Sequence, residues 1–595
     1  MASAFHKLSL LSALAVALLA AGCASVNNDP ASTADSGMPQ EPASAATGDT
    51  DSLPAPREDI AYGAFPEAVL TRVILAEMAG QRGYNRQAME EYMALAKETG
   101  DINIIKRASR IAAFLRDVPA SIAMSDMWLE REPDSLEAHQ TLAFQMLSMG
   151  RYRQGLDHLV RLLELGSNVD FRVITSRTAS DDDAVLFIDA LINDFENLLE
   201  TYPDNQSLRL SLAHLYQQND QIEAAYSLIS QLSREMDGAP EVVILEIQLL
   251  ELLGEHRRAE RRLQSSLQDH PDHKELRFLY ARKLIEEQNY SEARNQFGIL
   301  VEQDPEDYDM LYSLALINME VNRLNDAKRY FQRLVDNSAR LNDAHYYLGF
   351  INQQENSTDA AIEHYLQVES GSNFLQAQRN MTELMVQRGR YAEARERLER
   401  IRYTNPDYNI PLLTMEASVL IDEDFLNEAG KLLNSAVSSF PDDVQLLYLR
   451  SVLSQEQNNL ELMERDLRRM IQLNPNSPVA YNTLGYVLAD RTNRYQEAYD
   501  LIKRALDLSP NDPAIIDSMG WVQYRLGMYD AALENLDRAF ELYPDHEVVA
   551  HLGEVLWVLG EKDEANRIWQ DALKLQPDSE PIRDAMERLT NDSSI

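Results

Sequence analysis

Three groups of imidazole or carboxylate side chains have spacings that suggest metal chemistry. The first is the run His546-Glu547-Val548-Val549-Ala550-His551. A zinc-binding helix carries its two histidines four residues apart on one face, whereas these two are five residues apart. Five residues turn a helix by about 500°, so the two rings leave from different faces and cannot share one ion. The run therefore predicts no metal site.

The other two groups lie at expected turns. His270 and His273 flank a junction between two segments, where polar residues keep a turn soluble. Asp181, Asp182 and Asp183 precede an apolar segment, 184–199, and either bind a cation or begin a helix, whose N-terminal dipole favours negative charge. We favour a polar turn and a helix start over metal sites. The chain also has no phosphate loop, G-x-S-x-G elbow or S-x-x-K motif, so the sequence predicts neither catalysis nor a cofactor.

The single cysteine follows an apolar leader. Lys7 gives a short charged n-region, residues 8–19 are apolar, and Ala20-Ala21-Gly22-Cys23 is a small-residue cleavage site. The pattern resembles a bacterial lipoprotein signal, with Ala20 in place of the usual leucine, and this implies acylation of Cys23. A chance cysteine after a plain secretion signal is the alternative. Ala24 stands where an inner-membrane retention signal places aspartate, so the resemblance implies the periplasmic face of the outer membrane.

Composition separates a tether from a globular body. Residues 25–58 are rich in Ala, Ser, Pro, Asp and Gly and have almost no large apolar residue, which predicts a flexible tether. The whole chain is 45% hydrophobic and 25% charged, as is typical of a globular protein. Its 55 Lys and Arg against 96 Asp and Glu give a net charge of -41. This charge disfavours nucleic acid and favours a basic or mixed-charge protein partner, unless the acidity only maintains solubility.

A period of about 34 residues runs through the body. Prolines recur in steps of 33 to 35 residues wherever they are adjacent in the register, at Pro271, Pro305, Pro406, Pro441, Pro475, Pro510, Pro544 and Pro577. Between them stand small residues that let helices approach closely and a Gly or Asn that ends the first helix of a pair, as in Leu552-Gly553, Gly560 and Ala565. We predict an all-α, right-handed superhelical solenoid of about fourteen or fifteen tetratricopeptide-type helix pairs.

The same register sets the expected domain boundaries. These are a signal peptide at 1–22, the acylated Cys23 with its tether at 23–60, N-terminal helical repeats at 61–203, a superhelix at 204–579, and a capping helix and tail at 580–595. Segment 168–203 lacks the small-residue signature and is expected to be a divergent pair at a bend. Trp128 and Trp569 fall at packing positions of the repeat and are expected in the core.

Aromatic residues recur where the repeat is expected to face its concave groove. The first set, at position 5 of the repeat, is Phe278, Tyr312, Tyr346 and, further on, Tyr448. The second set, in the last three repeats, is Tyr486, Trp521, Tyr524 and Trp557, with Arg491 and Arg525 nearby in the chain. Exposed aromatic and arginine side chains dominate interface energetics, so we predict two partner-binding surfaces. The alternative for the first set is that neighbouring repeats cover the rings.

The order of Cys23, tether and repeats, with the C-terminal runs Asp517-Ser518-Met519-Gly520-Trp521 and His551-Leu552-Gly553-Glu554-Val555-Leu556-Trp557, resembles a family of large outer-membrane tetratricopeptide lipoproteins of Gram-negative bacteria. One member of that family is the adaptor that recruits a periplasmic carboxy-terminal processing protease and its cell-wall hydrolase substrates. The resemblance implies a non-enzymatic, anchored scaffold with protein partners. An assembly or export factor for an outer-membrane pore, pilus or exopolysaccharide system is the alternative.

Overall fold

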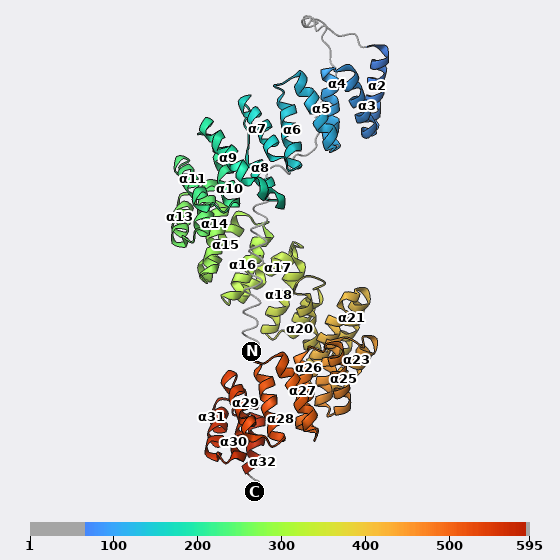
Figure 1. Cartoon of the computed structure of the whole chain (residues 1–595), viewed down its shortest axis with the longest axis vertical. Helices are drawn as coiled ribbons and strands as arrows, with labels where there is room; N and C mark the ends of the chain where they lie inside the picture. The colour runs from blue at the N-terminus through green and yellow to red at the C-terminus, as the bar shows by residue number, and fades with distance from the viewer. Residues whose placement is uncertain (1–65, 591–595) are drawn as a thin grey trace. The chain divides into compact units, whose positions relative to one another are not determined.

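The computed structural model describes residues 66–590 (Figure 1). The predicted signal peptide, the lipidation site Cys23, the tether and the last five residues lie outside this range. Every regular element within it is helical: 31 α-helices, α2 to α32, and the 3₁₀ turns η2 and η3. No helix in this range is long and apolar enough to cross a membrane.

The chain forms two compact units that divide between Arg323 and Leu324. The helices of the first unit are α2 (Glu67–Gln81), α3 (Asn85–Thr99), α4 (Ile102–Phe114), α5 (Val118–Arg131), α6 (Leu136–Ser148), α7 (Tyr152–Glu164), α8 (Arg172–Thr178), η2 (Asp182–Ala184), α9 (Val185–Thr201), α10 (Gln206–Gln218), α11 (Ile222–Glu235), α12 (Pro240–Leu252), α13 (His256–Asp269), α14 (Lys274–Glu286), α15 (Tyr290–Gln303) and α16 (Tyr308–Glu320).

The second unit contains the remaining helices. They are α17 (Leu324–Asp336), α18 (Leu341–Gln354), α19 (Thr358–Leu366), α20 (Phe374–Gln387), α21 (Tyr391–Thr404), η3 (Pro406–Tyr408), α22 (Asn409–Asp422), α23 (Leu426–Ser439), α24 (Val444–Glu456), α25 (Leu460–Leu473), α26 (Pro478–Arg491), α27 (Tyr495–Leu508), α28 (Pro513–Arg525), α29 (Tyr529–Leu542), α30 (His546–Leu559), α31 (Lys562–Leu575) and α32 (Glu580–Thr590). In chain order the helices form fifteen successive pairs, which confirms the predicted number, and a final α32 lies where the capping helix is expected.

Local chemistry fixes the helix boundaries. The first helix of many pairs starts at a side-chain cap, for example Asp443, which accepts a hydrogen bond from the Leu446 amide at 3.0 Å. His273 does the same for the Leu276 amide, so this histidine caps α14, as expected of a polar turn. The first helix then ends at a residue in the left-handed region, such as Gly560 at φ 93° or Asn322 at φ 57°, which confirms the predicted Gly or Asn stop.

The core is a series of local clusters, each shared by neighbouring repeats, as expected of a solenoid. Ala498 and Ala565 are fully buried where the second helix of a pair meets the first. Trp128 and Trp569 are buried, as predicted from their packing positions. The small residues thus set how closely paired helices approach.

The divergent pair is a shortened first helix followed by a normal second one. Helix α8 has only seven residues, whereas the neighbouring α6 and α10 have thirteen each. Asp181 accepts a hydrogen bond from the Asp183 amide and caps η2, which leads into α9, so the aspartates begin a helix as predicted. One hydrophobic cluster runs from Ala143 to Leu215 without a break at residue 203, the expected domain boundary.

Candidate protein-binding surface

The first helices of the last three repeats lie side by side and carry the second predicted set of aromatic residues. Helix α26 packs against α28, and α28 packs against α30. The Trp521 ring on α28 stacks on His551 of α30, with ring centroids 4.2 Å apart and planes inclined by 20°. The ring centroid of Tyr524 lies 5.2 Å from that of Trp521, and the ring centroid of Tyr486 on α26 lies 6.1 Å from that of His551. Tyr486, Trp521, Tyr524 and His551 therefore form one cluster across three helices, which we call the C-terminal aromatic cluster.

A buried ion pair supports this cluster from below. The Nδ1 atom of His551 lies 3.0 Å from both carboxylate oxygens of Asp517, and both side chains are buried. Burial alone would lower the pKa of His551, but the Asp517 carboxylate outweighs it and raises that pKa above its ordinary value. His551, which the pattern of aromatic residues did not single out, therefore joins α28 to α30. His546, the other histidine of the run considered as a metal site, takes no part in this contact.

A second buried carboxylate lies next along α30. Glu554 is buried and pairs with Arg588 of the capping helix α32, whose own side chain is mostly exposed. Burial raises the pKa of Glu554, and the Arg588 guanidinium partly opposes that shift. The capping helix therefore contributes a charge to the same face that α28 and α30 build.

The structure corrects the expected exposure of Trp521. Its ring is only 4% exposed, and its indole N–H is buried without an acceptor. The partly exposed members are Tyr486 and Tyr524, and the Arg525 guanidinium lies 5.6 Å from the Trp521 ring centroid. Arg525 also donates to the Tyr495 hydroxyl at 2.8 Å, and Arg491 donates to Asn458 at 2.9 Å. The accessible part of the cluster therefore consists of Tyr486, Tyr524 and Arg525. The rings of Trp521 and His551 are buried beneath them.

Trp557 does not join the C-terminal aromatic cluster. Its ring lies 6.0 Å from Trp569 of α31, and the Lys562 ammonium lies 4.8 Å from the Trp557 ring centroid. Trp557 is partly exposed, so it presents a separate aromatic surface at the end of the same helix. The sequence placed four aromatic residues together, and the structure brings three of them together.

The first predicted set is mostly buried, which corrects the expectation of a solvent-facing aromatic wall. Phe278, Tyr312 and Tyr346 are 7%, 3% and 8% exposed. Phe278 packs edge-on against Phe297 of α15, and Tyr346 packs against Tyr365 of α19, so position 5 reaches the second helix of its own pair. Burial raises the pKa of Tyr346 to about 12. All three rings are therefore buried, and for Phe278 and Tyr346 the covering ring belongs to the same helix pair and not to a neighbouring repeat.

Tyr448 is the member of the first set that does reach solvent. Its side chain is 39% exposed on α24. It offers an isolated aromatic group instead of part of a wall.

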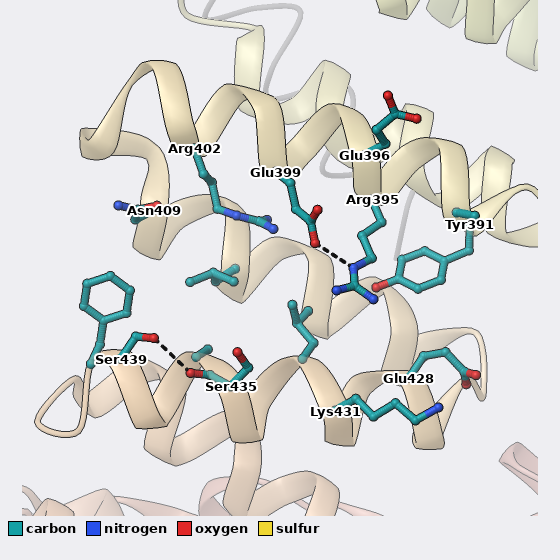
Figure 2. A pocket seen from close by; sticks show the side chains of 15 residues that line it. Tyr391, Arg395, Glu396, Glu399, Arg402, Asn409, Glu428, Lys431, Ser435 and Ser439 are labelled. Atoms are coloured by element: carbon teal, nitrogen blue, oxygen red, sulfur yellow. Dashed lines mark hydrogen bonds and ion pairs between the residues drawn. The ribbon is translucent and has the colours of Figure 1, made fainter.

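A slot that the repeat pattern did not predict opens between α21 and α23 (Figure 2). Its volume is about 690 Å³, and Leu413, Leu432 and Ala436 are among the apolar residues that line it. Arg395 and Glu399 of α21 face Lys431 and Ser435 of α23 across it, and Arg395 Nε donates to Glu399 at 2.8 Å. The 3₁₀ turn η3 precedes α22, and α21 makes little contact with α22, which leaves the space open.

A buried carboxylate fixes one wall of this slot. Glu416 is fully buried and accepts hydrogen bonds from Arg402 Nη1 at 2.7 Å and from the Tyr391 hydroxyl at 2.8 Å. Burial, together with the Glu416 charge, raises the pKa of Tyr391. The slot carries equal numbers of basic and acidic side chains, with three arginines or lysines and three glutamates, so its charge does not select the sign of a ligand.

No group of three or more His, Cys, Asp or Glu side chains suited to a metal ion occurs within residues 66–590. His546 and His551 behave as their spacing predicts, since His551 pairs with Asp517 inside the fold while His546 begins α30.

Comparison with known proteins identifies relatives of this chain. Models of the tetratricopeptide repeat match residues 252–314, 478–512 and 518–580. A TPR repeat-containing protein of Pseudomonas aeruginosa is 36% identical over 494 residues, which cover 83% of each chain.

Solved structures of helical-repeat proteins are also similar. A chain of the APC/C hetero-tetramer Cut9–Hcn1 is 16% identical with a TM-score of 0.30, covering 88% of this chain and 96% of that one. A thermophilic TPR protein of Thermus thermophilus is 20% identical with a TM-score of 0.27, covering 29% of this chain and 95% of that one. Scores this low carry no information about function.

Proposed function

Since this chain belongs to the tetratricopeptide-repeat protein family, we propose that it is a scaffold that holds other proteins on its first-helix surfaces. The observation that carries this proposal is the C-terminal aromatic cluster, where Tyr486, Tyr524 and Arg525 surround a buried Trp521–His551 stack. Tyrosine, tryptophan and arginine are the side chains that most often dominate interface energetics.

Rigidity is the physical reason for this choice of surface. A partner loses affinity for every side chain that must be ordered on binding, at about 0.5–1.5 kcal/mol each. Here the Asp517–His551 pair and the ring stack already hold the base of the surface in place. Tyr524 can therefore bury area against a partner at a low entropic cost.

The finer assignment follows the resemblance of the sequence to outer-membrane lipoproteins. In this proposal Cys23 is acylated and anchors the chain to the periplasmic face of the outer membrane. The scaffold recruits a carboxy-terminal processing protease and its cell-wall hydrolase substrates, and holding both on one chain raises their effective concentration without a catalytic residue. An assembly or export factor for a pore, pilus or exopolysaccharide system is the second candidate, favoured by the same anchor.

Site-specific photo-crosslinking in living cells tests this proposal. A photoreactive phenylalanine analogue at position 524 is expected to capture a protein that the same analogue at position 403 does not. Tyr403 is the matched control, because it is 89% exposed on α21 and lies outside the cluster. Mass spectrometry of the product then separates a protease or hydrolase from an export component. Equal products at 524 and 403 would rule out the cluster as the binding surface.

A further inference from the structure

A polar bridge between the two helices of a pair recurs at one spacing in several repeats. The bridge joins a residue of the first helix to the residue nineteen positions later, on the second helix. Examples are Arg72 with Glu91 at 2.5 Å, Arg277 with Gln296 at 2.5 Å, and Gln378 with Arg397 at 2.9 Å. In each of these bridges an arginine donates to an oxygen acceptor, so the bond holds at any pH from mildly acidic to alkaline.

Two repeats replace this arginine bridge by a pair of histidines. His139 of α6 faces His158 of α7, and His345 of α18 faces His364 of α19, each with the two Nδ1 atoms 3.0 Å apart. The ring centroids are 5.2 and 5.3 Å apart, with planes inclined by 48° and 39°. The same geometry thus occurs once in each compact unit.

The tautomer of the first pair follows from its surroundings. The His139 Nε2 atom lies 2.9 Å from the carbonyl oxygen of Pro133, which can only accept, so Nε2 carries the proton. In a neutral ring Nδ1 of His139 then has no proton, and Nδ1 of His158 must donate to it. Arg277 donates to the carbonyl of Pro271 from the equivalent position, so this second contact also belongs to the bridge.

Protonation removes such a bond. When the accepting ring gains a proton, both facing Nδ1 atoms become donors, and two N–H groups point at each other. We propose that His139–His158 and His345–His364 are proton-sensitive locks, which close their helix pairs at neutral pH and release them on acidification. The arginine bridges of other pairs, such as Arg277–Gln296, do not titrate in this range and stay closed.

The local environment favours the neutral form of His158, His345 and His364. Burial lowers the pKa of His158, and His139 adds to this while Asp157 on α7 opposes it. Burial lowers the pKa of His364 to about 4, with further lowering from His345 and from Lys328 on α17. The pKa of His345 is lowered by burial as well.

The second lock has the larger structural consequence. Helix α19 has nine residues, whereas the second helices of the neighbouring pairs, α17 and α21, have thirteen and fourteen. His364 lies in its last turn beside the buried Tyr365. Tyr365 packs against Tyr346 and donates to Gln353 of α18, so the lock is one of the contacts that hold this turn. Release of this lock is therefore expected to weaken the attachment of α19 to α18.

The sign and size of the effect follow from linkage. A histidine whose folded-state pKa is lowered stabilises the fold above its unfolded pKa, and this stability is lost as the pH falls from there toward the folded value. With about 6.5 in the unfolded state and about 4 for His364, the opening equilibrium of α19 is expected to rise about tenfold or more between pH 7.5 and pH 5.0.

The experiment exchanges the lock for one that the chain itself uses. The double variant His345→Gln with His364→Arg reproduces the Gln378–Arg397 bridge in the α18–α19 pair. Hydrogen exchange of the full chain is measured at pH 7.5 and 5.0 with EDTA present and corrected for intrinsic rates. In the natural chain the protection of α18 and α19 should fall about tenfold or more at pH 5.0, while α24 and α25 serve as the internal reference. In the double variant this fall should disappear.

Two outcomes would overturn the proposal. One is unchanged protection of α18 and α19 in the natural chain at pH 5.0, and the other is an equal loss in the double variant. If the double variant folds poorly, titration of the labelled His364 ring by NMR in the natural chain decides instead: an apparent pKa at or above the ordinary 6.5 would contradict a neutral lock. The locks share no residue with the C-terminal aromatic cluster, so this result is independent of the crosslinking result.

Discussion

The Trp569 indole lies directly against the backbone of Gly553, so that a Cβ atom added at residue 553 would stand 2.1 Å from the indole Nε1 atom. Gly553 is on α30 and Trp569 is on α31, and the tryptophan is fully buried. Helices α30 and α31 can therefore pack this closely only because residue 553 has no side chain.

The substitution Gly553→Ala should accordingly destabilise the C-terminal pair. An overpacked site costs about 1–3 kcal/mol, and here neither the tryptophan ring nor the backbone has a flexible end that can give way. Hydrogen exchange of α30 and α31 measures the loss. Gly298→Ala is the matched control, because nothing lies within 4 Å of a Cβ at that helical position. The control should stabilise α15 by about 0.5–1 kcal/mol, and equal effects of the two variants would contradict the close approach.

Removal of Arg402 should be costly, since it leaves the fully buried Glu416 without its cationic partner. Breaking a buried pair costs about 3–5 kcal/mol, and we expect Arg402→Ala to lower the free energy of unfolding of the α21–α23 region by about 3 kcal/mol. Arg400→Ala on the same helix removes the same charge from a mostly exposed side chain and should change it by less than about 0.5 kcal/mol. Denaturant titration followed by hydrogen exchange gives both values, and a mild effect of Arg402→Ala would mean that water reaches Glu416.

The Asp517–His551 pair predicts a pH dependence opposite in sign to that of the histidine locks. Because the pKa of His551 is raised, the pair stabilises α28 and α30 fully below the ordinary histidine pKa of about 6.5. That stability is lost as the pH rises through the folded-state value. Protection of α30 against hydrogen exchange should therefore decrease from pH 6 toward pH 9, after correction for intrinsic rates. Asp517→Asn should remove this decrease, and parallel profiles for the two chains would show that the pair does not titrate as expected.

The lone cysteine predicts the location of the chain. Cys23→Ser should abolish acylation and move the protein from the membrane fraction to the soluble periplasmic fraction, because no other residue of the leader can carry the lipid. Ser25→Ala, two residues further on, should leave the protein with the membrane. Fractionation and immunoblotting of the two variants measure this, and retention of Cys23→Ser in the membrane would exclude the anchor.

Much of the fold could be predicted because the tetratricopeptide repeat is local. Spacing along one helix shows where a small residue such as Ala498 must sit, where a residue such as Gly560 ends the helix, and that His546 and His551 leave from different faces. The number of helix pairs follows from the same 34-residue register. The divergent pair was visible as a loss of that register between residues 168 and 203, although its first helix turned out to be shortened to α8.

The candidate site could be predicted less well from the sequence. Periodicity indicates on which face of its own helix a side chain lies. It does not show which side chains of the neighbouring helix cover it. Phe278 and Tyr346 were expected to face the groove, yet they pack against rings on the second helices of their pairs. The slot beside Glu416 depends on how far α21 stands from α22, which no motif encodes.

The sequence by itself determined the repeat, its helix boundaries and its packing positions, because those depend on contacts within one or two turns of helix. Only the tertiary structure decided which rings are buried, that His551 joins Trp521 to Asp517, and that His345 meets His364. Those contacts join residues on separate helices, and their distances depend on how closely the helices pack. Burial, and with it the pKa of a histidine, is a property of that packing and not of the residue type.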